Sequence, residues 1–114
     1  MKARDSVSTG WRQAAIKAIA HKLARAALHV LREQTRRHDL VGRMGGEELA
    51  MILPETGLEA ARQLAQRIRL RVGSLMPVID GVAIPVTVSL GVAEARSDDT
   101  SIAEPLKRAD RALY

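Results

Sequence analysis

The chain has 114 residues, 46% of them apolar and 27% charged, which is the size and composition of one globular domain and excludes a disordered chain. It has no cysteine, no apolar run of about 18 residues and no apolar N-terminal stretch, so we expect a cytoplasmic protein without disulfides, membrane segment or signal peptide. The net charge of +5 favours an anionic partner, either nucleic acid or a phosphorylated small molecule, unless it only marks a solvated basic surface.

The first predicted element is helical and covers Trp11 to Arg37. Apolar residues recur in this stretch at steps of three and four, with Arg, Lys and Gln between them. These apolar residues are Ile16, Ile19, Leu23, Ala27, Val30 and Leu31. Since no Pro or Gly interrupts the stretch, we expect either one long helix or two helices joined near residues 24–27.

A β-hairpin is predicted next. Residues 39–44 and 47–53 are two strand-like runs on either side of Gly45 and Gly46. A pair of glycines suits a tight turn that needs positive φ. Pro54 is expected to end the second strand.

A helix from residue 57 to about residue 72 follows the hairpin. Thr56 and Glu59 form a possible capping box at its start. Its expected buried stripe is Leu58, Ala61, Leu64, Ala65, Ile68 and Val72.

The last third contains one more strand and one more helix. Asp80-Gly81 is a turn signal, and residues 82–92 alternate apolar with small or polar residues as a strand does. A second capping box, Ser101 with Glu104, predicts a helix to the C-terminus. Interleaved helices and strands predict an α/β or α+β domain.

The tip of the predicted hairpin combines two glycines with two adjacent carboxylates, Gly45-Gly46-Glu47-Glu48. Glycines let backbone N–H groups approach a phosphate, and carboxylates hold Mg²⁺, which is often shared with substrate phosphates. The combination suits a nucleoside triphosphate. Neighbouring strand residues point to opposite faces, so both glutamates reach one metal only if the turn twists them. The alternative is a tight turn with solvated acids.

The segment Gly45-Gly46-Glu47-Glu48-Leu49 resembles the GGDEF/GGEEF signature of diguanylate cyclases, with Leu at the fifth position. The segments DLVGRMGGEELAMILPET, AARQLAQRIR, VTVSLGVAEA and LKRADRALY, within residues 39–114, also resemble the family and occur in its order. STGWRQ at residues 8–13 is similar to the family's opening LTGLxNR element. The resemblance implies a nucleotidyl-cyclase-like sheet that contains antiparallel strands and is flanked by helices, in a cyclic di-GMP signalling protein.

Members of this family condense two GTP molecules into cyclic di-GMP between two facing domains. The resemblance therefore implies GTP as substrate, a homodimer when active, and Mg²⁺ (or Mn²⁺) as cofactor. It implies that Gly45 and Gly46 contact substrate phosphate. Glu47 would be the metal ligand and catalytic acidic residue, and Glu48 would assist as a second catalytic, metal-binding carboxylate.

A second family site is similar to the segment Arg36-Arg37-His38-Asp39, which matches the RxxD motif of the product-inhibition site in residues and spacing. Arg67 matches the position of a further arginine of that site. The resemblance implies that Arg36, Asp39 and Arg67 bind cyclic di-GMP. Arginine forks suit phosphates and guanine edges, and an aspartate accepts from guanine N–H groups. The alternative is an ordinary ion pair of Arg36 and Asp39 at a helix end.

The sequence departs from the family in its N-terminal part. Residues 14–26 resemble the family's opening helix and run directly into residues 27–34, which resemble the helix before the signature. The first strand and following helix, with their DxD-like, FKxIND and GHxxGD motifs, are therefore expected to be missing, as are the AK and GR residues beyond the last helix. We expect a helical part over residues 1–37, a signature part over residues 39–114, and a sheet without the usual first central strand.

Three functions follow from these patterns. A diguanylate cyclase of impaired activity is favoured by the signature. A catalytically inactive cyclic di-GMP-binding regulatory module is favoured by the missing acidic strand, because two glutamates on one hairpin make a poor Mg²⁺ site. A nucleic-acid-binding domain rests on charge alone, and one Trp and one Tyr leave few aromatic rings for base stacking, so nucleic acid is not expected as a partner.

Overall fold

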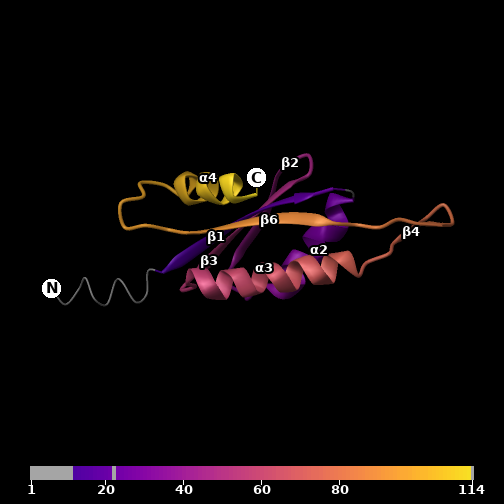
Figure 1. The fold of residues 1–114 in the computed structure, drawn as a ribbon, viewed down its shortest axis with the longest axis horizontal. Helices are drawn as coiled ribbons and strands as arrows, with labels where there is room; N and C mark the ends of the chain where they lie inside the picture. The colour runs from indigo at the N-terminus through magenta and orange to yellow at the C-terminus, as the bar shows by residue number, and fades with distance from the viewer. Residues whose placement is uncertain (1–11, 22, 114) are drawn as a thin grey trace.

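A four-stranded antiparallel sheet organises the molecule, with helices on both of its faces (Figure 1). The structure is a computed structural model that describes residues 12–21 and 23–113. Its helices are α2 (Ala24–Gln34), α3 (Leu58–Gly73) and α4 (Ala103–Ala112), and its strands are β1 (Gln13–Ala20), β2 (Leu40–Gly45), β3 (Glu48–Pro54), β4 (Val78–Ile79), β5 (Val82–Ala83) and β6 (Val88–Glu94). The sheet order is β2-β3-β1-β6. The predicted fold class, an antiparallel sheet flanked by helices in a mixed α/β domain, is confirmed. Across the described residues, no helix has the length and apolar character needed to cross a membrane.

Residues 13–20 form a strand where the sequence predicted a helix. This strand, β1, lies in the centre of the sheet, paired with β3 on one side and β6 on the other. The expectations of a helix over these residues and of a sheet without its first central strand are therefore wrong. Residues 14–18 are all buried, because both faces of a central strand are covered. Apolar and polar residues do not alternate in such a run as they do in a half-exposed strand. The spacing of its apolar residues therefore does not distinguish a central strand from a buried helix. The helical expectation is correct for α2. Trp11, where the predicted helix was expected to begin, lies outside the described residues.

The hairpin and the helix after it are close to their predicted bounds. β2 and β3 pair antiparallel, and α3 buries five of the six stripe residues expected for it. The two capping boxes, however, do not form, because no side chain caps the N-terminus of α3 or α4. The Thr56 hydroxyl donates to Pro54 O at 2.9 Å instead. The Glu104 carboxylate accepts from the Thr100 hydroxyl instead.

The long strand predicted over residues 82–92 is interrupted. Val82–Ala83 pairs only with Val78–Ile79 in a small hairpin, and the chain rejoins the main sheet at Val88. The turn at residues 80–81 is confirmed, with φ of 51° at Asp80 and 78° at Gly81. Pro85 lies in the break, where its missing N–H and fixed φ do not suit continuous pairing. This hairpin projects beyond the sheet, at the end of the molecule labelled β4 in Figure 1.

The main core lies between the sheet and helices α2 and α3, which share one face of it. Its largest fully buried side chains include Ile16, Leu31, Leu49, Met51, Leu53 and Ile68. Helix α4 covers the opposite face and approaches β6 closely at Gly91. A Cβ at that position would overlap the carbonyl oxygen of Ala109, so the absence of a side chain sets how near α4 lies to the sheet.

The loop between β6 and α4 is held by Arg108. Its two Nη atoms donate to the Asp99 carboxylate at 2.9 and 2.8 Å, and Nη2 also donates to Glu94 O at 2.9 Å. The Arg96 backbone N–H donates to the same carboxylate at 2.7 Å. Because Arg108 donates to the charged form, it holds the pKa of Asp99 well below its usual range, with the Arg96 N–H adding to the effect. The loop therefore depends on an ionised Asp99.

Replacing Asp99 with Asn is expected to reduce the loss of stability in acid. A carboxyl whose folded pKa is depressed contributes stability above its unfolded pKa of about 3.9, and that contribution disappears as the pH falls toward the folded value. Denaturant midpoints at pH 7 and below pH 4 measure the effect, with Asp98→Asn as the exposed neighbouring control. Equal acid sensitivity of wild type and Asp99→Asn would contradict this assignment.

Candidate functional site

The tip of the β2–β3 hairpin is a tight, exposed turn. Gly46 and Glu47 are the turn residues, and Gly46 has φ of 50°, a left-handed conformation that favours glycine. A register shift between Arg43 and Gly45 precedes the turn, and Arg43 Nε donates to Gly46 O at 2.8 Å. The Glu47 carbonyl accepts from Ala20 N at 2.9 Å, which ties the turn to the end of β1. The predicted two-glycine turn is thus present, displaced by one residue toward Glu47.

The two signature glutamates differ in their surroundings. Glu48 is the first residue of β3, and its Oε1 lies 2.8 Å from the ammonium of Lys17 on β1. The same ammonium lies 3.1 Å from Asp110 Oδ1 on α4. The hydrogen bond to Glu48 raises the pKa of Lys17, against an opposing effect of burial. Glu47 is exposed and makes no ion pair with any described residue.

Sequence reasoning missed Lys17. Its only distinguishing feature in the sequence is that it stands alone as a charged residue in the otherwise apolar run of residues 14–20. The predicted helix placed it among the polar residues between the apolar ones. In the central strand it is one of two buried polar residues in the described part of the chain, the other being Thr56.

The residues at the hairpin do not fit a divalent metal ion. Strand β1, which lies next to the signature, carries no acidic residue. Residues 12–21 and 23–113 contain no group of three or more His, Cys, Asp or Glu side chains placed to hold a metal. Glu48 is already neutralised by an ammonium. Mg²⁺ prefers several oxygen ligands, and Glu47 alone does not supply them.

Arg36 and Asp39 are brought together between α2 and β2. The Asp39 carboxylate is 2% exposed and accepts from Arg36 N at 2.7 Å and from Arg36 Nη2 at 3.1 Å. Arg36 Nη2 also donates to Pro54 O at 2.8 Å and to Thr56 Oγ1 at 2.7 Å. The ion pair left open as the alternative is therefore present. The Arg36 side chain is 50% exposed, so its guanidinium is held in place and still accessible to solvent.

Arg67 lies in the middle of α3 on its exposed side. No hydrogen bond or ion pair within the described residues joins it to Arg36 or Asp39. The structure thus joins two of the three residues predicted for the inhibition site and leaves the third as an exposed arginine on the helix that follows the hairpin.

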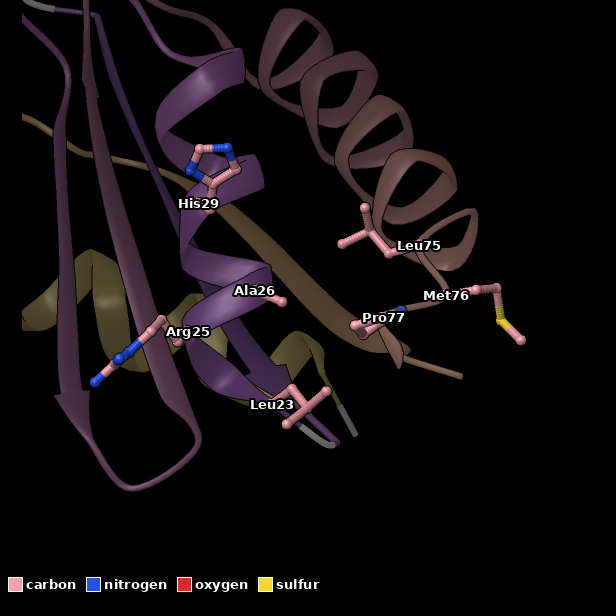
Figure 2. A pocket seen from close by; sticks show the side chains of 7 residues that line it. All are labelled: Leu23, Arg25, Ala26, His29, Leu75, Met76 and Pro77. Carbon is pink, nitrogen blue, oxygen red and sulfur yellow. The ribbon is translucent and has the colours of Figure 1, made fainter. Parts of the chain in front are cut away.

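A cavity of about 670 Å³ lies between the start of α2 and the segment after α3 (Figure 2). It is lined by Leu23, Arg25, Ala26, His29, Leu75, Met76 and Pro77. Leu75 and Pro77 point toward α2, whereas the Arg25 side chain points away from the gap. The lining is mostly apolar and includes none of the residues predicted for a site. Nothing in the sequence pattern had singled it out.

Comparison with known proteins gives a consistent result. The family model described as diguanylate cyclase, GGDEF domain, matches residues 18–114. Diguanylate cyclase DgcM of Escherichia coli K12 is 43% identical over 89 residues, covering 78% of this chain and 21% of the relative. Diguanylate cyclase A of Treponema denticola is 39% identical over 85 residues, covering 75% and 23%. Diguanylate cyclase DgcP of Pseudomonas aeruginosa is 37% identical over 84 residues, covering 74% of this chain and 12% of the relative. The chain thus spans less than a quarter of the length of these relatives.

Solved structures share the fold. The GGDEF domain of DgcB from Caulobacter crescentus, in complex with c-di-GMP, matches with a TM-score of 0.81 at 23% identity over 99% of this chain and 77% of that chain. The active GGEEF domain of a diguanylate cyclase from Vibrio cholerae matches with a TM-score of 0.78 at 23% identity over 99% and 80%. Diguanylate cyclase SiaD of Pseudomonas aeruginosa matches with a TM-score of 0.79 at 26% identity over 98% of this chain and 48% of that chain.

Proposed function

This chain belongs to the GGDEF family, and we propose that it binds cyclic di-GMP as a regulatory module and has little or no cyclase activity of its own. Cyclic di-GMP carries two phosphates and two guanines, so its binding needs cations and hydrogen-bond donors at fixed positions. The DgcB domain, which shares this fold, was solved in complex with c-di-GMP. The net charge of +5 also favours an anionic ligand.

The fixed guanidinium of Arg36 is the observation that carries this proposal. Asp39, Pro54 O and Thr56 hold it in one orientation while half of the side chain stays exposed. An arginine that is already ordered loses less side-chain entropy when a ligand binds. In this proposal Asp39 is a positioning residue, because its carboxylate is buried and occupied by Arg36. Arg36 and Arg67 contact the phosphates or guanine edges of the ligand.

The surroundings of the signature glutamates support binding without synthesis. Phosphoryl transfer by this family relies on positioning and on neutralising phosphate charge with metal ions. Here Glu48 is paired with Lys17, and β1 has no carboxylate to complete a metal site. The proposed binding therefore involves no divalent ion, and we assign neither Mg²⁺ nor Mn²⁺ to it.

A second candidate function is GTP condensation by two facing copies of the chain. The exposed turn favours it, because Gly45, Gly46 and Glu47 are accessible and Glu47 has no ion-pair partner among the described residues. In that case the two glycines would contact substrate phosphate, and Glu47 with Glu48 would carry the chemistry.

Replacing Arg67 with Ala is expected to weaken cyclic di-GMP binding by roughly 10- to 100-fold, since a charge-assisted hydrogen bond contributes about 1.5–3 kcal/mol. Arg67 makes no hydrogen bond or ion pair with the described residues, so the variant should keep its fold. Calorimetric titration with cyclic di-GMP measures the effect, and Arg36→Ala should weaken binding at least as much.

The matched control is Arg69→Ala, which removes another exposed arginine of α3 and the same charge. Its affinity should remain close to that of the wild type, because exposed charges add little at ordinary salt. The proposal fails if the wild-type chain binds no cyclic di-GMP, or if all three arginine variants bind it equally well.

A further inference from the structure

Lys17 is a buried charge in the centre of the sheet. Its side chain is only 9% exposed, and its ammonium lies 2.8 Å from Glu48 Oε1. The same ammonium donates a hydrogen bond to Asp110 Oδ1 at 3.1 Å. These carboxylates belong to β3 and α4, so one ammonium on β1 joins the signature hairpin to the C-terminal helix.

The sheet leaves room for this side chain beneath α4. Lys17 lies opposite Ala50 of β3 and Gly91 of β6. Residues directly opposite each other in a sheet direct their side chains to the same face. Because both neighbours are small, the lysine stem fits under the helix. Glu48 lies two residues before Ala50 and therefore faces the same way, within reach of the ammonium.

The ammonium occupies the space from which a cation would bind Glu48. Mg²⁺ lies about 2.0–2.1 Å from its oxygen ligands, so an ion on Glu48 would come close to Lys17. Like charges at such short range in a partly buried site repel each other strongly. Without Lys17, the carboxylates of Glu48 and Asp110 would face the same space with no cation between them.

We propose that Lys17 is the built-in cation of the signature hairpin: its ammonium neutralises Glu48 and keeps divalent metal ions away from it. Lys17 is then a positioning residue that also fixes the hairpin to α4. The inference goes beyond cyclic di-GMP binding, and its test uses no nucleotide. The two proposals can therefore fail separately.

Uptake of Mn²⁺, followed by the EPR signal of the free ion, tests this inference. The wild-type chain is expected to take up no Mn²⁺ in the millimolar range. Lys17→Met keeps an unbranched side chain but removes the charge, so its affinity for Mn²⁺ should be at least about tenfold higher than that of the wild type. Lys107→Met, which removes an exposed lysine of α4, is the matched control and should behave as the wild type.

Two results would overturn the inference. The first is Mn²⁺ uptake by the wild-type chain that disappears in Glu48→Gln, since the hairpin would then hold the ion in spite of the ammonium. The second is a folded Lys17→Met chain, judged by circular dichroism, that takes up no more Mn²⁺ than the wild type. If Lys17→Met does not fold, Lys17→Gln replaces it, because the amide keeps a hydrogen-bond donor for both carboxylates.

Discussion

Replacing Gly91 with alanine is expected to destabilise the fold by about 3 kcal/mol or more, which is the upper end of overpacking costs. The new Cβ would overlap Ala109 O and lie 2.9 Å from Leu113 N. Both are backbone atoms of the α4 region, so no side chain can rotate to relieve the clash. Helix α4 would have to move off the sheet, which would also separate Asp110 from Lys17. Chemical denaturation followed by circular dichroism measures the change.

Gly42→Ala is the matched control for this prediction. Gly42 is also a strand glycine, in β2, but a Cβ there meets nothing within 4 Å. Its free energy of unfolding should change by no more than about 0.5 kcal/mol. Equal effects of the two substitutions would show that α4 does not pack on Gly91 as the structure has it.

Truncating Ile16 to alanine is expected to cost about 2–5 kcal/mol, the range for deleting a buried isoleucine side chain. Ile16 is fully buried in β1, between Met51 of β3 and Val92 of β6 in the sheet register. The lost methyl groups leave a cavity in a core that contains no phenylalanine to fill it. The free energy of unfolding from urea denaturation provides the measurement.

The control for Ile16→Ala is Ile79→Ala. Ile79 is 41% exposed and lies in the small β4–β5 hairpin, away from the main core. Its truncation should change stability by less than about 1 kcal/mol, because a large part of its side chain already lies in water and the small hairpin is separate from the main core. A small effect at Ile16 and a large one at Ile79 would contradict the central placement of β1.

Local patterns were sufficient for the signature hairpin and for α3. The glycine pair predicts a tight turn, which the structure places one residue later, at residues 46–47, and the stripe from Ala61 to Val72 has the spacing of one helix face. These features depend on residues close to one another in sequence. The family resemblance added the antiparallel sheet with helices on its faces, which local patterns alone do not determine.

β1 was not predictable from its own residues. A strand buried on both faces has no alternation, and alanine favours helices by intrinsic propensity. What makes residues 13–20 a strand is pairing with β3 and β6, which are about 35 and 75 residues further along the chain. The capping box predicted at Thr56 is absent for a related reason, because the Thr56 hydroxyl accepts a hydrogen bond from the distant Arg36 instead of capping α3.

The candidate site was only partly predictable. Motif spacing identified Arg36 and Asp39, and the structure joins them. Motif spacing could not show that the Asp39 carboxylate is buried, nor that Lys17 reaches Glu48, because both depend on contacts between distant segments. These two contacts change the expected chemistry: they leave one ordered arginine exposed and one signature glutamate neutralised.

The proposed function of this chain is to bind cyclic di-GMP without making it. The most direct measurement is incubation of the purified chain with GTP and Mg²⁺ or Mn²⁺, with cyclic di-GMP quantified by chromatography and its binding titrated on the same preparation. We expect binding that weakens in Arg36→Ala, and no more product than a Glu47→Ala control forms. Product formation by the wild-type chain that Glu47→Ala abolishes would contradict the proposed function.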